Sequence, residues 1–190
     1  FFFKQKTAYE ISPRDWSSDV CSSDLWGFQT GHQTEWAKLL LALERLTPGA
    51  QRDDPESWML RRARELFGQA VHHGWDRHHG GLAYGFAPKG NPATDTHLHI
   101  CDPHKYHWVQ AETLAAAAVL AERTHDGGYW DWYDRLWQYV WSHFVDHQHG
   151  AWYRVLAADN HRLDDNKSPA GKVDYHNMGA CLEIMAALTR

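Results

Sequence analysis

The segment that decides the fold is KYHWVQAETLAAAAVLAER, which runs from Lys105 to Arg123. Its apolar residues recur at helical spacing, and alanine is crowded through its middle. Small side chains let neighbouring elements approach a helix closely, so we expect this helix to be buried among others. The chain is therefore predicted to fold by packing helices against helices.

Four further segments carry the same helical period and give an all-α fold class. The first helix begins at Gly31, the second starts near Pro55, and the last opens near Asn177. The apolar positions that define the four helices are Trp36, Leu39, Leu40 and Leu43 in the first, Met59, Ala63, Leu66, Phe67 and Ala70 in the second, Trp130, Tyr133, Trp137, Val140, Trp141 and Phe144 in the fourth, and Met178, Cys181, Leu182 and Met185 in the last.

Two short segments between the helices, Gly81–Phe86 and Gly150–Leu156, have strand character. Each is expected to form a β-hairpin with the polar residues that follow it. The order of elements then repeats as a His-bearing motif, two helices and a Gly-aromatic hairpin. His32, His107 and His176 open successive cycles at similar intervals.

Such a repeat predicts an array of helical hairpins, because one pair of helices cannot bury its apolar face alone. If the array closes, it forms an α/α barrel with short β-hairpins in its loops. The first helix of each pair would line the interior. Its N-terminal end would face the same mouth as the Gly-aromatic loops.

The opening residues 1–25 are expected not to belong to this fold. Their last part, DWSSDVCSSDL, resembles the translation of a sequencing-adapter oligonucleotide, and a disordered polar leader is the alternative. We therefore expect one domain over residues 26–190, and expect it to be part of a longer protein.

Composition narrows the function classes. The net charge is −5 and no block of Lys or Arg occurs, which argues against nucleic acid and anionic membranes as partners. No apolar run is long enough to span a bilayer. Only Cys101 and Cys181 follow residue 25, which favours a reducing compartment and hence a cytoplasmic location. The many Trp residues suggest a small carbohydrate ligand, because sugars stack on aromatic rings.

The motif GHQTEW places His32 and Glu35 on one face at a helix start, next to Trp36. The positive end of the helix dipole disfavours imidazolium, which would keep His32 neutral and able to accept a proton. The alternative is that Glu35 only caps the helix. We take His32 and Glu35 as candidate catalytic residues and Trp36 as a candidate substrate contact.

A second motif, DYHN, places Asp174 and His176 at another helix start. A polar helix cap is again the alternative interpretation. If both histidines reach one mouth, however, they could transfer protons on either side of one carbon. His176 is therefore the second catalytic candidate, with Asp174 as a substrate contact.

A third motif, from Lys105 to Glu112, offers an aromatic wall and polar groups for sugar hydroxyls. Trp108, Gln110 and Glu112 are the candidates there, although Trp108 could also belong to the core. Trp152 in the second Gly-aromatic segment is a further candidate for sugar stacking.

We expect no metal and no cofactor. A zinc site could be drawn through His97, His99 and His104, but their spacing matches no standard pattern and no Cys pair supports it. The sequence has no glycine-rich phosphate loop.

Four stretches together resemble the N-acylglucosamine 2-epimerase superfamily, which includes mannose isomerases and cellobiose 2-epimerases. They are WGFQTGHQTEWAKLL (26–40), KYHWVQAE (105–112), GAWYRVL (150–156) and KSPAGKVDYHNMGACLEI (167–184). The resemblance implies an (α/α)6 barrel, of which this chain would be the C-terminal portion.

The resemblance also implies site residues. His32 and His176 would be the two catalytic histidines, Glu35 the acidic partner of the first, and Trp108 part of an aromatic wall. Thr30 stands where the family often has proline. An arginine and a further histidine that the family places in its N-terminal half have no counterpart here.

The implied mechanism needs neither a metal nor a redox cofactor. The sugar opens to its aldehyde, one histidine removes the C2 proton, and the enediolate is reprotonated at C1 to give a ketose or at C2 to give an epimer. A free aldose such as mannose is the expected substrate. The alternatives are a carbohydrate hydrolase of the α/α-barrel type and a non-catalytic sugar-binding fragment.

Overall fold

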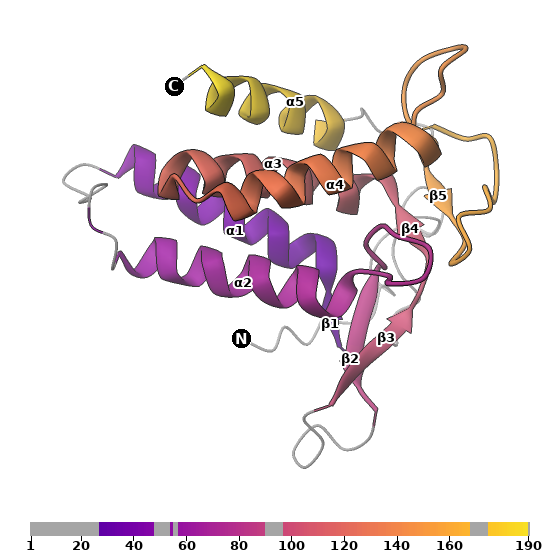
Figure 1. Cartoon of the computed structure of the whole chain (residues 1–190), viewed down its shortest axis with the longest axis horizontal. Coiled ribbons are helices and arrows are strands. Elements are labelled where there is room, and N and C mark those ends of the chain that lie inside the picture. The colour runs from indigo at the N-terminus through magenta and orange to yellow at the C-terminus, as the bar shows by residue number, and fades with distance from the viewer. Residues whose placement is uncertain (1–26, 48–53, 55–56, 90–96, 168–174, 190) are drawn as a thin grey trace, which may run out of the picture.

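The computed structural model describes residues 27–47, 54, 57–89, 97–167 and 175–189 (Figure 1). The predicted leader (1–25), the expected helix start at Pro55 and the candidate Asp174 lie outside the described residues. The five predicted helices are present: α1 (Thr30–Leu46), α2 (Trp58–Gly74), α3 (His107–Thr124), α4 (Gly127–His143) and α5 (Tyr175–Leu188). The strands are β1 (Phe28–Gln29), β2 (Gly85–Pro88), β3 (Leu98–Asp102), β4 (Lys105–Tyr106) and β5 (Val155–Leu156).

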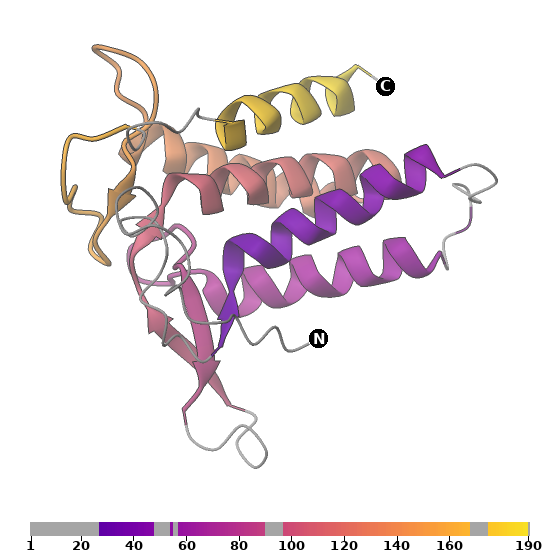
Figure 2. The same cartoon turned by 180° about the vertical axis from the view of Figure 1, so that it is seen from behind.

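The helices form two layers. One layer is the row α1, α3 and α5, in which α3 packs against both neighbours, and the other places α2 on α1 and α4 on α3. Every residue from Val109 to Ala121 is buried, as the alanine content of this segment predicts. In both views the row helices begin at the end of the molecule where the strands gather (Figures 1 and 2).

The hairpin expected after the second helix is confirmed with shifted boundaries. β2 begins at Gly85 and pairs antiparallel with β3, and β1 adds to its other edge with Phe28 opposite Phe86. The second predicted hairpin is present in irregular form: Leu156 bridges Arg162, and the backbone N–H of Ala157 donates to the C=O of His161 at 2.8 Å. β5 also pairs with β4.

The predicted repeat is visible in two equivalent loops. Asp76 and Asp146 each accept hydrogen bonds from the backbone N–H groups two and three residues later, at 2.9 and 3.1 Å in both loops. Each carboxylate also pairs with a lysine: Asp76 with Lys105 at 2.8 Å, and Asp146 with Lys167 at 2.5 Å. The two loops are thus built on the same plan.

α1 does not bury the residues that set its apolar period. Its buried face carries Thr34, Ala37 and Leu41, whereas Trp36 and Leu43 are 52% and 51% exposed. Smaller side chains on the buried face allow α1 to pack between α2 and α3. Within the described ranges, no helix has both the length and the apolar character needed to cross a membrane.

Candidate active site

Two of the predicted histidines meet at Trp108. The His32 ring in the first turn of α1 lies 5.2 Å from the Trp108 ring, and the His176 ring at the start of α5 lies 5.3 Å from it. A Cβ at Gly31 would overlap the Trp108 ring, so the missing side chain permits this approach. Three helix starts far apart in sequence therefore contribute to one site.

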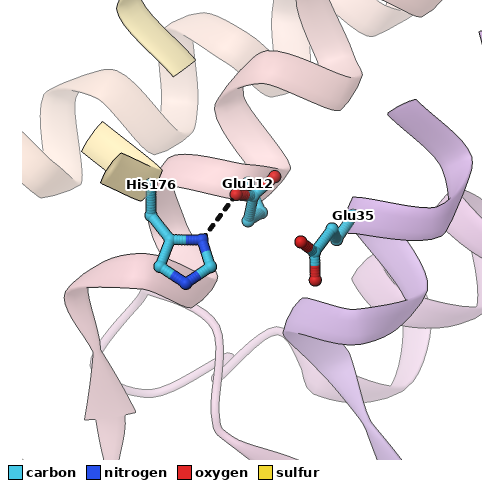
Figure 3. A group of neighbouring side chains, drawn as sticks. All are labelled: Glu35, Glu112 and His176. Carbon is cyan, nitrogen blue, oxygen red and sulfur yellow. Dashed lines mark hydrogen bonds and ion pairs between the residues drawn. The ribbon is translucent and has the colours of Figure 1, made fainter. Parts of the chain in front are cut away.

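His176 is held by a buried carboxylate. Its Nδ1 lies 2.7 Å from Oε1 of Glu112 on α3, and the Glu112 side chain is 2% exposed (Figure 3). An ionised carboxylate only accepts hydrogen bonds, so Nδ1 of His176 carries the proton. The Nε2 atom of a neutral His176 then keeps its lone pair and can act as a base.

Glu112 has a second partner on α1, because the Lys38 ammonium donates a hydrogen bond to its Oε2. Burial alone would raise the pKa of Glu112, but the hydrogen bonds from His176 and Lys38 outweigh it and hold the pKa below its usual value. The carboxylate was predicted to bind sugar hydroxyls. Its contacts instead place it behind His176, where it joins α1, α3 and α5.

The surroundings shift the pKa values of His32 and Glu35, the two titratable groups of the GHQTEW motif, in opposite directions. Desolvation by the surrounding side chains lowers the pKa of His32, and the charge of His176 lowers it further, against the pull of Glu112. Burial and the Glu112 carboxylate raise the pKa of Glu35, partly offset by His176 and Lys38. His32 is therefore neutral at neutral pH.

The alternative that Glu35 merely caps α1 finds no support. The N-cap residue is Gln29, and no side chain makes a capping hydrogen bond there. Glu35 lies a turn beyond the N3 position that a capping box requires. It faces Glu112 and His176 instead (Figure 3).

The remaining predicted contacts differ in their positions. Gln110 is fully buried and exchanges hydrogen bonds with the backbone N–H and C=O of Leu82, at 2.9 and 2.8 Å, so it supports a loop. Its role as a sugar contact stays a prediction. Trp152 is half-buried against the core between α3 and α4. Trp36 is exposed on α1, one residue after Glu35.

Among the described residues, one group has the spacing of metal ligands. Atoms of Glu35, Glu112 and His176 lie within 4.8 Å of one another, while His97, His99 and His104 form no such group. Glu112 already accepts from the Lys38 ammonium and from His176. A metal cation at this point would have to displace the Lys38 ammonium from the Glu112 carboxylate.

Lys38 is the residue that sequence reasoning missed. It lies three positions after Glu35 and so neighbours Glu35 on the helix surface, and this spacing was the available signal. Its side chain is 12% exposed.

The family model for N-acylglucosamine 2-epimerase (GlcNAc 2-epimerase) matches residues 4–180. A D-mannose isomerase of Marinomonas mediterranea is 51% identical over 164 residues, which cover 86% of this chain and 38% of that protein. The chain thus spans less than half the length of this relative.

Solved structures show the same relationship. The crystal structure of a D-mannose isomerase matches with a TM-score of 0.72 and 50% identity, over 85% of this chain and 37% of that one. A cellobiose 2-epimerase from Spirochaeta thermophila matches with a TM-score of 0.67 and 25% identity, over 86% and 38%. The described helices therefore form part of an (α/α)6 barrel, as predicted.

Proposed function

The chain belongs to the N-acylglucosamine 2-epimerase family, and we propose that its complete protein isomerises or epimerises a free aldose of the mannose type. The observation that carries the proposal is the meeting of His32 and His176 at Trp108, with His176 held by Glu112. The proposal extends to the mannose class because the D-mannose isomerase of Marinomonas is 51% identical to this chain over the 164 residues that align.

The proposed chemistry is proton transfer through an enediolate. The Nε2 lone pair of one histidine removes the proton on C2 of the open-chain sugar, and the C–H electron pair becomes the C1–C2 double bond while the charge moves to the C1 oxygen. Return of that proton to C1, with transfer of the O2 proton to O1, turns the C2–O2 bond into a carbonyl and gives the ketose. Delivery of a proton to the opposite face of C2 by the second histidine gives the epimer.

Each histidine has a feature that suits this task. The lowered pKa of His32 keeps its imidazole neutral and ready to accept a proton. The Glu112 carboxylate fixes the tautomer of His176 and stabilises the imidazolium that forms after proton removal. Trp108 provides an aromatic wall between them.

The test uses the complete protein with D-mannose in heavy water, followed by proton NMR. Loss of the C2 proton signal with appearance of fructose or glucose is expected. His32→Ala and His176→Ala should each reduce this exchange by about 100-fold or more, the usual scale of general acid–base help. The control His161→Ala changes an exposed loop histidine and should leave the rate unchanged. Full activity in both site variants would contradict the proposal.

The hydrolase alternative requires two carboxylates that flank a glycosidic bond. Glu35 and Glu112 are the neighbouring pair, but the Glu112 side chain is buried and both of its oxygens have partners. Release of reducing sugar from an oligosaccharide would favour the hydrolase. Calorimetric binding of mannose without C2 exchange would favour a sugar-binding protein.

A further inference from the structure

We propose that Lys38 is a positioning residue which, through Glu112, fixes the tautomer in which Nε2 of His176 can act as a base. The inference rests on the proposed function for its kinetic consequence. Its structural part, the control of His176 by Lys38, stands on the described contacts alone.

The geometry is a relay of two contacts. The Lys38 ammonium of α1 binds Oε2 of Glu112, and Oε1 of Glu112 lies 2.7 Å from Nδ1 of His176 on α5. The side chains of Lys38, Glu112 and His176 are 12%, 2% and 17% exposed. Water screens such enclosed charges poorly, so each group acts strongly on the next.

Lys38 influences His176 because few groups around the imidazole carry a positive charge. The titratable or charged groups that face His176 are Lys38, Glu35 and His32 on α1, Glu112 on α3, and the neighbouring Tyr175 phenol on α5. Lys38 is the permanent cation of this set. Its ammonium helps to hold the pKa of Glu112 below the usual value, so that the carboxylate stays ionised beside His176.

Lys38 also controls the tautomer. With Lys38 in place, Glu112 stays ionised and can only accept from Nδ1 of His176. Without the lysine, Glu112 is more easily protonated and can then donate to Nδ1. That hydrogen bond would place the imidazole proton on Nε2, where the base needs a lone pair.

The kinetic test compares Lys38→Met with wild type in the complete protein. Removing the cation lets Glu112 take up a proton more easily, so the acid limb of the kcat/KM profile for D-mannose should move to higher pH. We expect a loss of about tenfold near pH 6 and a smaller loss near pH 9, because a shift of about one pKa unit in Glu112 changes the ionised fraction tenfold on the acid side. Lys38→Arg keeps the charge and should restore most of the wild-type profile.

Arg45→Met is the matched control. Arg45 lies further along α1 and pairs with Glu183 on α5 at 2.8 Å, so its loss also removes an ion pair that spans two helices. It does not touch Glu112 or the histidines. Its acid limb should coincide with that of wild type, whereas a shift equal to that of Lys38→Met would assign the effect to general loosening of α1 and overturn the proposal.

A second readout needs no turnover. Histidine labelled with 15N reports the tautomer of His176, assigned by comparison with His176→Gln. Wild type should show the proton on Nδ1, and Lys38→Met should show it shifted toward Nε2 as the pH falls. Identical spectra at every pH in the two proteins would overturn the proposal. If wild type lacks C2 exchange but the His176 tautomer changes as stated, the proposed function fails while the role of Lys38 stands.

Discussion

At the scale of single residues, the candidate site depends on how neighbours hold its two imidazoles. His32 packs against Trp108 and lies close to His176, and desolvation together with the charge of His176 lowers the pKa of His32. A histidine tuned in this way binds its proton less readily than a free one. The ring therefore stays a base into mildly acidic solution.

This shift predicts a specific pH dependence. His32 should titrate below the range of free histidine when followed by NMR. The unfolded chain binds the His32 proton at higher pH than the folded chain does. The contribution of His32 to the free energy of unfolding is therefore present above the unfolded pKa, and it is lost as the pH falls through the folded pKa. A His32 midpoint at or above that of free histidine would contradict the assignment.

Residue types and spacings predicted the histidines but not the contacts behind them. His32 and Glu35 lie three apart at a helix start, which is a local pattern, and the structure brings them to His176. The environments of Gln110 and Glu112 depend on segments far away in sequence. In the structure Gln110 is buried and supports a loop, whereas Glu112 is buried and contacts Lys38 and His176.

At the scale of helices and strands, local periodicity predicted which segments are helical because a helix satisfies its own backbone. It did not predict the buried face of α1, since that depends on neighbouring helices. The pairing of β5 with β4 could not be predicted from local sequence either, because the helices α3 and α4 separate the two strands along the chain.

Two helical glycines provide a prediction about packing. Gly31→Ala would place a Cβ 2.9 Å from Cγ2 of Val109 and in overlap with the Trp108 ring, so it should lower the free energy of unfolding by about 1–3 kcal/mol. Gly68→Ala meets nothing within 4 Å and should stabilise α2 by about 0.5–1 kcal/mol. Urea unfolding of both variants measures the difference, and equal effects would contradict it.

The two repeated loops differ in the burial of their lysines. Lys105 is 0% exposed and also donates to Ala158 O and Asn160 Oδ1, both at 2.7 Å, whereas Lys167 is 29% exposed. Lys105→Met should therefore destabilise the fold by about 3 kcal/mol or more, because it strands buried partners. Lys167→Met should cost about 1 kcal/mol or less. Thermal or urea unfolding checks the order, and a larger loss for Lys167→Met would refute it.

At the scale of the whole molecule, large apolar side chains gather on the exposed faces of α1 and α5. They include Leu39, Leu43, Met178, Leu182 and Met185, with 43–65% of each side chain exposed. Apolar patches shared by two adjacent elements are unusual on monomeric proteins.

The 190-residue chain by itself is therefore expected to self-associate. Light scattering after gel filtration should give a mass above that of one chain, and the double variant Leu39→Gln, Leu182→Gln should reduce it. Leu163→Gln, a control at an exposed residue outside these helices, should leave the mass unchanged. A monomer at all concentrations would contradict this expectation.

The position of Glu112 also has a consequence for the order in which the protein folds. Its two partners lie 74 residues upstream and 64 residues downstream, on helices that pack against opposite sides of α3. A folding intermediate that contains only one of these helix pairs leaves a buried carboxylate half-compensated, which is costly. We therefore expect the candidate site to form only after both helices have packed against α3, so that activity should return in the slowest refolding phase, together with the last long-range contact.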